Sequence, residues 1–207
     1  MTVGEGPGAV ALNVSRETYE RLQIFADLLV KWNPKINLVS RASLPHLWSR
    51  HIVDSLQVYR AAPRTDHWAD LGSGGGFPGV IAAILAAEPA SDTRVTLIES
   101  DQRKAVFLRT AARECGVSIN VLAQRIESAP PQSAGVVSAR ALADLTTLLG
   151  YATRHAAPDG TMLFLKGKTW GKEVEDARAT WQFDCDAVKS ETEPEAVLLV
   201  IKGVSRD

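Results

Sequence analysis

The sequence predicts an α/β fold, in which a mostly parallel sheet is covered by helices and preceded by a helical segment. Downstream of Pro63, short apolar runs alternate with amphipathic stretches, which is typical of repeated strand-helix units. The apolar runs are nearly continuous, as in parallel strands that are buried on both faces. The last two runs follow one another without a helix between them, which indicates an antiparallel edge.

Composition places the chain among globular proteins of one domain. It has 207 residues, of which 45% are hydrophobic and 23% charged, and this excludes a disordered, collagen-like or coiled-coil protein. It contains no apolar run of about 18 residues and no signal pattern at its start, so we expect a cytoplasmic protein without a membrane partner. The two cysteines and four histidines lack metal-ligand spacing, so we expect reduced thiols and no bound metal.

The net charge of −1 hides an uneven distribution of charge along the chain. Residues 28–53 include no Asp or Glu, whereas residues 173–195 are rich in both. The basic residues of the acid-free stretch are Lys31, Lys35, Arg41 and Arg50. A generally adhesive nucleic-acid binder is therefore excluded, but a local basic face near the N-terminus is predicted.

Two helices are predicted ahead of the sheet. The first begins after Ser15, a favourable N-cap, and ends at Pro34, because the residue before a proline disfavours helix. The second begins at Ser43 and ends before Pro63. We therefore expect a flexible segment over 1–14, helices over 15–62 that face RNA, and a sheet domain over 63–207, packed as one compact unit.

The pattern after Pro63 predicts seven strands, joined mostly by helices. The predicted strands cover residues 67–71, 95–98, 119–123, 135–138, 162–165, 183–188 and 197–201. The predicted helices cover residues 80–87, 102–113, a segment through 145–149, and residues 172–181.

A glycine-rich segment, DLGSGGGFPG, follows the first predicted strand from Asp70 to Gly79. Glycines allow tight turns and close approach of a ligand to the backbone, and open α/β sheets bind ligands at this end of their strands. Residues 74–79 match G-x-G-x-x-G, a permissive dinucleotide signature. The D-x-G-x-G-x-G spacing that starts at Asp70 instead resembles motif I of class I methyltransferases, which bind S-adenosylmethionine. A glycine-rich turn without a ligand is the third interpretation.

Glu99 ends the next predicted strand, one helix after the glycine-rich segment. A carboxylate at this position can accept hydrogen bonds from both hydroxyls of a ribose. Glu99 therefore favours a nucleoside ligand, but it does not distinguish a nicotinamide cofactor from S-adenosylmethionine. A solvated loop acid is the plainer interpretation.

Several short segments occur in order along the chain. They are NLVS (37–40), RHIVDSL (50–56), the glycine-rich segment, ESDQRKAVFL (99–108), SARA (138–141) and LKG (165–167). Together they resemble the RsmG (GidB) family of small-subunit ribosomal RNA methyltransferases over about residues 15–202. The glycine-rich segment alone is generic, but its combination with R-H-x-x-D-S before it and S-x-R-A after it is specific.

The resemblance implies a class I methyltransferase fold of the Rossmann-like type. It implies transfer of a methyl group from S-adenosylmethionine, leaving S-adenosylhomocysteine, to N7 of guanine 527 in the 530 loop of 16S ribosomal RNA. The implied cofactor-binding residues are Asp70, Gly72, Gly74, Phe77, Glu99, Ile126, Glu127 and Arg140. One departure is the stiff segment with Pro130 and Pro131, which leaves the contact with adenine less defined than the contact with the glycine-rich segment.

The implied chemistry needs no catalytic base. Guanine N7 carries a free lone pair, so in-line attack on an activated methyl group requires no prior removal of a proton. We therefore predict that no side chain acts as a general base, and that catalysis depends on holding the reacting atoms about 3 Å apart in line.

The implied substrate requires an RNA-binding surface. The candidate residues are Lys31, Lys35, Arg41, Arg50, His51, Arg103 and Lys166. Arg50 and His51 have a second interpretation, in which one of them pairs with Asp54 on the same helix. Trp32 and Trp48 lie on apolar helical stripes, so core packing is favoured over stacking on bases.

Two other functions explain parts of the sequence. An NAD-dependent oxidoreductase would explain the glycines and Glu99, but not the basic helices or the SARA segment. A non-catalytic RNA-binding factor for ribosome assembly would explain the basic helices, but the intact glycine-rich segment argues against it. Binding of NAD instead of S-adenosylmethionine would identify the oxidoreductase. Salt-sensitive RNA binding without methyl transfer would identify the non-catalytic assembly factor. We expect 16S ribosomal RNA or the small subunit as partner, and a monomer, because no apolar stripe is left over.

Overall fold

The computed structural model describes residues 6–88 and 91–206. The helices are α1 (Ala9–Leu12), α2 (Arg16–Ile36), η1 (Leu44–His46), η2 (Trp48–Ile52), α3 (Val53–Ala61), α4 (Gly79–Ala86), α5 (Gln102–Glu114), α6 (Leu145–His155) and α7 (Trp170–Ala177). The strands are β1 (His67–Leu71), β2 (Arg94–Ile98), β3 (Asn120–Leu122), β4 (Ala134–Arg140), β5 (Ala156–Lys166), β6 (Trp181–Lys189) and β7 (Val197–Arg206). Among the described residues, no helix is both long and apolar enough to cross a membrane.

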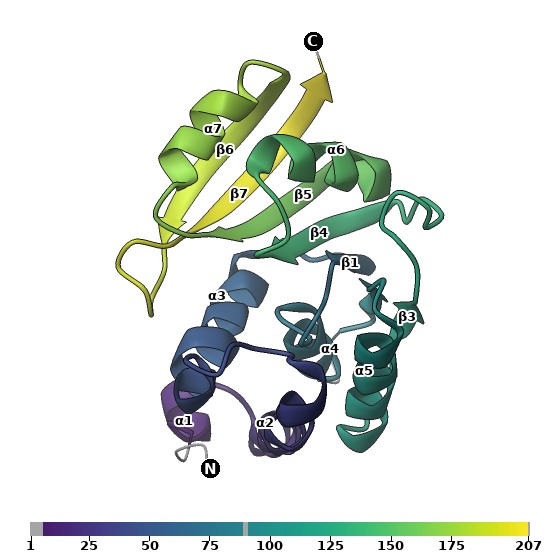
Figure 1. The fold of residues 1–207 in the computed structure, drawn as a ribbon, viewed down its shortest axis with the longest axis vertical. Coiled ribbons are helices and arrows are strands. Elements are labelled where there is room, and N and C mark those ends of the chain that lie inside the picture. Colours follow the sequence, from purple (N-terminus) through teal and green to yellow (C-terminus); the bar gives the residue numbers. More distant parts are fainter. Residues whose placement is uncertain (1–5, 89–90, 207) are drawn as a thin grey trace.

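The strands form one seven-stranded sheet in the order β3-β2-β1-β4-β5-β7-β6 (Figure 1). The first five strands in this order are parallel, and β7 runs antiparallel to both β5 and β6. The predicted mostly parallel sheet with an antiparallel edge is therefore confirmed. In the register, Asp70 of β1 lies between Leu97 of β2 and Ser138 of β4.

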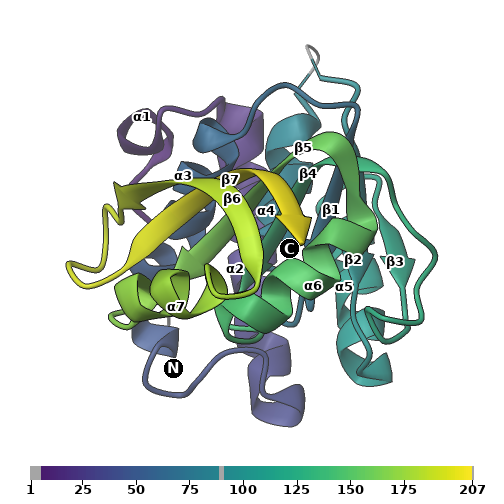
Figure 2. The same ribbon diagram turned by 90° about the horizontal axis from the view of Figure 1, so that it is seen from above.

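Helices cover both faces of the sheet (Figure 2). Side chains alternate between the two faces along a strand, so Trp68 packs in one buried cluster and its neighbour Ala69 in the other. The first cluster contains side chains of α2, α3, α4 and α5, and the second contains those of α6 and α7. The N-terminal helices therefore share one core with the helices on the same face of the sheet.

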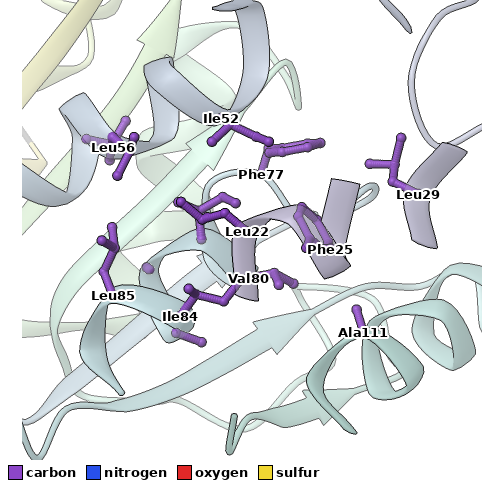
Figure 3. Close-up of a cluster of buried hydrophobic side chains, with 14 of the residues drawn as sticks. Leu22, Phe25, Leu29, Ile52, Leu56, Phe77, Val80, Ile84, Leu85 and Ala111 are labelled. Atoms are coloured by element: carbon purple, nitrogen blue, oxygen red, sulfur yellow. The ribbon is translucent and has the colours of Figure 1, made fainter. Parts of the chain in front are cut away.

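Figure 3 shows where the N-terminal helices meet the glycine-rich segment. Phe25 of α2 and Ile52 of η2 lie beside Phe77, and all three are buried. The rings of Phe25 and Phe77 are 5.4 Å apart in an edge-on arrangement. Burial of such side chains is the main favourable contribution to folding, so core packing holds the helical extension against the glycine-rich segment.

Helix α2 begins as predicted, because Ser15 Oγ accepts a hydrogen bond from Thr18 N at 3.1 Å. Its predicted end at Pro34 is wrong, since the helix continues to Ile36. A proline removes only its own backbone N–H, and the last turn of this helix accommodates that loss. The helix ends instead at Asn37, whose left-handed conformation (φ 51°) closes it.

The single helix predicted between Ser43 and Pro63 is interrupted. A 3₁₀ turn (η1) and a π-helical turn (η2) precede the regular helix α3. Apolar periodicity misses this because a few residues cannot distinguish 3.6 residues per turn from a tighter or wider turn. π-Helical turns are rare in proteins, but those that occur often lie at functional sites. This one carries Arg50 and His51.

The remaining differences lie at element boundaries. β5 begins at Ala156 instead of residue 162, and α7 ends at Ala177 instead of residue 181. Trp181, which was predicted to end the helix, is instead the first residue of β6. Its side chain packs in the second buried cluster. Of the predicted flexible segment over 1–14, residues 1–5 lie outside the described residues, and Ala9–Leu12 form one helical turn.

Candidate active site

The carboxyl ends of β1, β2 and β4 lie side by side in the middle of the sheet. β1 runs into the glycine-rich segment, Glu99 directly follows β2, and Arg140 is the last residue of β4. The chain connections diverge between β1 and β4, and open α/β sheets bind ligands at such a point. The topology therefore brings the predicted cofactor-binding groups to one edge.

Three glycines of the segment have positive φ angles, a conformation that other residues rarely adopt. These angles are 63° at Gly72, 50° at Gly74 and 91° at Gly76. Ser73 N donates a hydrogen bond to Ile98 O at 3.1 Å, which ties the segment to β2. The segment is therefore a defined turn held against the neighbouring strand.

Two further glycines are required by close contacts. A Cβ atom on Gly75 would lie 2.9 Å from the backbone oxygen of Leu38 in the N-terminal extension. A Cβ atom on Gly79 would lie 2.4 Å from Leu97 Cδ2 and 2.7 Å from Asp70 Oδ2. The backbone of the segment is thus pressed against both the extension and the sheet.

Glu99 organises the backbone on which a ribose would rest. Its Oε2 accepts a hydrogen bond from Gly74 N at 2.8 Å, and its Oε1 accepts one from Asp101 N at 2.7 Å. A carboxylate has about four acceptor positions, so two backbone bonds leave capacity for ligand hydroxyls. The position suits the predicted ribose contact, and it also gives Glu99 a structural role in holding Gly74.

Asp70 lies beneath the glycine-rich segment and is fully buried. Ser138 Oγ donates a hydrogen bond to its Oδ1 at 2.7 Å, and Trp68 Nε1 donates to Ser138 Oγ at 2.8 Å. Burial raises the pKa of Asp70 to about 6, although the Ser138 hydroxyl opposes the shift. Asp70 therefore shapes the segment from below, and its Oδ2 is buried without a hydrogen-bond partner among the described residues.

Arg140 is anchored by one half of its guanidinium. Its Nη2 donates a hydrogen bond to Arg50 O at 2.7 Å and lies 3.3 Å from Asp54 Oδ2. Burial lowers the pKa of the guanidinium, and the charge of Asp54 opposes this. Its Nη1 is buried and has no hydrogen-bond partner among the described residues. Arg140 thus presents an unused donor at the end of β4, which suits an anionic or carbonyl group of a ligand.

His51 lies against the glycine-rich segment, where its ring stacks on Phe77 with the centroids 5.0 Å apart and the planes inclined by 29°. Neither ring nitrogen has a partner among the described residues. Burial, reinforced by the charges of Arg140 and Arg50, lowers the pKa of His51 to about 3. The imidazole is therefore neutral near pH 7.

Comparison with known proteins decides the family. The family model described as rRNA small subunit methyltransferase G (GidB) matches residues 18–197. The chain belongs to this family. A Ribosomal RNA small subunit methyltransferase G from a Ruegeria species is 61% identical over 204 residues, covering 99% of this chain and 100% of the relative. The protein of the same name from Ruegeria pomeroyi is 62% identical over 200 residues, covering 97% of this chain and 98% of the relative.

Solved structures support the class I methyltransferase fold. The O-methyltransferase from Bacillus cereus, solved in complex with S-adenosylhomocysteine, superposes with a TM-score of 0.54 at 12% identity, covering 91% of each chain. At that identity the likeness concerns the fold alone. GidB membership identifies the chain as a methyltransferase and not as an NAD-dependent oxidoreductase.

The two residues predicted to flank adenine lie after β3. Ile126 is buried, and its carbonyl is 3.0 Å from Nε2 of His155 in α6. Glu127 is exposed, and hydrogen bonds from its own backbone N–H and from Tyr151 lower its pKa. The pair therefore offers an apolar side chain anchored by α6 and a neighbouring carboxylate at the surface.

Five of the seven predicted RNA-binding residues are exposed in this GidB structure, and these five form two groups. Lys31, Lys35 and Arg41 are exposed on the N-terminal extension. Arg50 and Arg103 are exposed but already paired, Arg50 with Glu193 at 2.5 Å and Arg103 with Asp101 at 3.2 Å. The expected alternative, pairing of Arg50 or His51 with Asp54, is wrong, because Asp54 pairs with Arg140.

Lys166 is the exception among these residues, because it is buried at the end of β5. Its Nζ donates hydrogen bonds to Ala143 O at 2.6 Å and to Glu173 Oε2 at 2.7 Å. Glu173 also accepts a hydrogen bond from Leu145 N at 3.1 Å. This arrangement favours a structural role for Lys166, which holds the loop after β4, over the RNA contact that we expected.

Sequence reasoning missed two residues that shape the site. Leu142 lies over the glycine-rich segment, with its Cδ1 2.6 Å from the position of a Cβ on Gly72. Glu193 lies in the turn between β6 and β7, and its carboxylate forms an ion pair with Arg50 of η2. A single apolar residue in a loop and an acid in an acidic stretch carry no periodic signal, so neither was recognisable in the sequence.

Trp32 and Trp48 both pack against other aromatic rings of the protein. The Trp32 ring lies 5.7 Å from that of Phe107, and the Trp48 ring stacks on Tyr19 at the same distance. Both contacts favour core packing over base stacking, as predicted.

Within residues 6–88 and 91–206, no three His, Cys, Asp or Glu side chains are grouped in a way that could hold a metal ion.

Proposed function

We propose that this protein transfers a methyl group from S-adenosylmethionine to N7 of guanine 527 in the 530 loop of 16S ribosomal RNA. The observation that carries the proposal is the match to GidB over residues 18–197, in a chain that brings the glycine-rich segment, Glu99 and Arg140 to one edge of the sheet. We further expect the reaction to take place in the cytoplasm, with the protein acting as a monomer.

The residues at this edge fit the cofactor. Glu99 has free acceptor capacity for the ribose hydroxyls, and Gly74 has neither a side chain of its own nor another side chain close above it to keep a ligand away. The unpartnered Nη1 of Arg140 suits the carboxylate of the methionine portion. Ile126 and Glu127 would flank the adenine. When bound, S-adenosylmethionine supplies an electrophilic methyl group on a sulfonium centre.

The chain's own contribution to the reaction is orientation. Guanine N7 needs no deprotonation, so the site requires no general base, and His51 beside Phe77 would be a weak one because burial lowers its pKa to about 3. Holding two reactants in line can lower a barrier by about 7–11 kcal/mol. The rigid turn made by Gly72, Ser73 and Gly74 and the anchored guanidinium of Arg140 are the parts that would provide it.

The exposed cations of the N-terminal extension would hold the RNA. Lys31, Lys35 and Arg41 lie in the stretch 28–53, which holds no Asp or Glu. The carbonyl of Arg50 accepts a hydrogen bond from Arg140 at the end of β4, and Arg103 lies in the first turn of α5, which follows β2. In a plot of log affinity against log salt concentration, the slope becomes shallower by about one unit for each phosphate contact that is lost. Single alanine variants of these residues are therefore expected to weaken RNA binding and to reduce that slope.

The proposal is tested with labelled S-adenosylmethionine and small subunits that lack the modification. The expected result is label on one guanine of the 530 loop, mapped as 7-methylguanosine by chemical cleavage. Particles that already carry the modification are the matched control and should take up no label. Tight binding of S-adenosylhomocysteine without label on particles, precursors or free 16S ribosomal RNA would contradict the substrate assignment and leave the cofactor assignment standing.

A further inference from the structure

The backbone at His51 is held in an uncommon conformation from two sides. His51 lies in the π-helical turn η2, Ser55 Oγ donates a hydrogen bond to His51 O at 2.7 Å, and Arg140 Nη2 donates to Arg50 O at 2.7 Å. π-Helical turns are costly relative to α-helix and are frequent at functional sites. The structure therefore fixes the place from which the His51 side chain projects.

The His51 ring is fixed as well. One face stacks on Phe77, which belongs to the glycine-rich segment, so the ring lies directly beside the predicted cofactor site. Both ring nitrogens are buried and unpartnered among the described residues. Buried polar groups in folded proteins almost always have partners, so an exception requires an explanation, such as a ligand that the site awaits.

Packing alone does not explain this histidine. Phenylalanine or leucine would fill the space against Phe77 without two unsatisfied nitrogens. A general base is not required either, because guanine N7 carries no proton. Burial, together with the nearby charges of Arg140 and Arg50, keeps the ring neutral, so it offers one N–H donor and one acceptor nitrogen.

We propose that His51 recognises the target guanine by a hydrogen bond to its O6–N1 edge. This inference rests on the proposed function and names the group that selects the base. Guanine O6 accepts hydrogen bonds and N1–H donates one, whereas adenine has an amino group and a bare nitrogen at these positions. The edge lies beside N7, so a side chain adjacent to the cofactor site can contact it while N7 faces the methyl group.

The test compares two bases that share N7 but differ at the recognised edge. 16S ribosomal RNA with guanine or with 2-aminopurine at the target position is reconstituted into particles, and kcat/KM for methyl transfer is measured for each. 2-Aminopurine keeps N7 and the 2-amino group but lacks O6 and N1–H. The His51→Phe variant keeps the ring stack on Phe77 and removes both nitrogens. His46→Phe, at an exposed histidine five positions earlier, is the matched control.

The expected result is a loss of discrimination. His51→Phe lowers kcat/KM for guanine by about tenfold or more, which corresponds to one lost hydrogen bond, and leaves 2-aminopurine unchanged. Its affinity for S-adenosylhomocysteine stays within about twofold of wild type, and His46→Phe behaves as wild type. If His51→Phe does not fold, His51→Leu, which also lacks the nitrogens, is measured in the same way and is expected to lose the same discrimination.

Two outcomes overturn the inference, and a third overturns the proposed function on which it rests. An unchanged guanine to 2-aminopurine ratio in a folded His51 variant shows that His51 does not read this edge. A parallel loss of S-adenosylhomocysteine affinity assigns His51 to the cofactor instead of the base. If wild-type protein does not methylate the guanine particle, the proposed function itself fails. If wild-type protein is active but the His51 variant keeps the same guanine to 2-aminopurine ratio, only this inference fails.

Discussion

The carboxylate of Asp54 and the guanidinium of Arg140 form an ion pair of 3.3 Å that joins α3 to the end of β4. Asp54 also accepts hydrogen bonds from the hydroxyls of Ser190 and Thr192, in the turn between β6 and β7. Three parts of the chain that are far apart in sequence therefore meet at one buried carboxylate. This meeting point sets where the free Nη1 of Arg140 lies.

Replacing Asp54 with alanine is expected to destabilise the protein and to release Arg140. Removing one partner of a buried ion pair costs about 3 kcal/mol, because the other charge is left without compensation. Urea unfolding should show this loss, and S-adenosylhomocysteine affinity should fall in the variant that remains folded. Asp159→Ala, at an exposed aspartate, is the control and should unfold as wild type. Equal S-adenosylhomocysteine affinity in both variants would separate Asp54 from the cofactor site.

Lys166→Met is expected to lower stability more than RNA binding. The substitution leaves Glu173, which is only partly exposed, without its cation, at a cost of about 3 kcal/mol in urea unfolding. The double variant Lys166→Met with Glu173→Leu removes both charges and should recover part of the loss. A normal unfolding curve together with a reduced salt slope of RNA binding would instead restore Lys166 as an RNA contact.

Gly79→Ala and Gly171→Ala should have opposite effects. An added methyl at Gly79 meets Leu97 and Asp70, so overpacking is expected to cost about 1–3 kcal/mol. Gly171 lies in α7 with no atom within 4 Å of the added methyl, so alanine should stabilise by about 0.5–1 kcal/mol through helix propensity. Thermal unfolding of the two variants checks both signs, and a stabilised Gly79→Ala protein would refute the contact.

Glu99→Gln is expected to weaken cofactor binding by about tenfold, as one hydrogen bond to a backbone N–H is lost. Only one oxygen of the amide can accept, so either Gly74 N or Asp101 N loses its partner. Titration calorimetry with S-adenosylhomocysteine measures the change. Affinity equal to wild type would show that neither the ribose contact nor the Gly74 bond depends on the carboxylate.

Stability should depend on pH through His51. In the unfolded chain the imidazole gains a proton near pH 6.5, whereas in the folded protein the pKa is lowered to about 3, so between these values the unfolded state binds more protons. The free energy of unfolding therefore falls as pH is lowered from 6.5, by up to about 1.4 kcal/mol per pH unit from this group. His51→Gln should give a shallower fall between pH 6.5 and pH 4 in urea titrations. Parallel curves for the two proteins would contradict a neutral buried His51.

Asp70 acts in the opposite direction over part of this range. Its pKa is raised from 3.8 to about 6, so between these values the folded protein binds more protons and stability falls as pH rises. Comparing wild type with the single His51 variant at each pH removes this contribution, because Asp70 is present in both.

Local sequence signals were sufficient for most of the architecture. The predicted strands overlap all seven strands of the sheet. Continuous apolar runs indicated the central strands, because a strand buried on both faces needs apolar residues throughout, whereas the edge strand β6 is buried only at alternate residues near its start. Ser15 and the glycine-rich segment were recognisable because a cap and a turn with positive φ depend on the residue itself. Pro34 was misread because a proline near a helix end is judged by its place in the turn, which the residue type alone does not reveal.

The partners of charged side chains could not be predicted in this way. Sequence spacing allowed Asp54 to pair with Arg50 or His51, but the fold pairs Asp54 with Arg140 and Arg50 with Glu193. Lys166 looked like a free cation and is buried against Glu173. Ion pairs of this kind depend on which loops the sheet order brings together, and their sequence separation carries no periodic trace.

The amino-acid order thus established the fold class, the family and the segment that would cradle the cofactor, because each is encoded in residues close together along the chain. The three-dimensional arrangement settled which half of the Arg140 guanidinium is free, that neither ring nitrogen of His51 has a partner among the described residues, and how the turn between β6 and β7 reaches Asp54. The contacts around Arg140 and in the β6–β7 turn join segments far apart along the chain, 90 residues for Arg140 with Arg50 and 136 for Ser190 with Asp54, which only the packing of β4, α3 and the β6–β7 turn brings together.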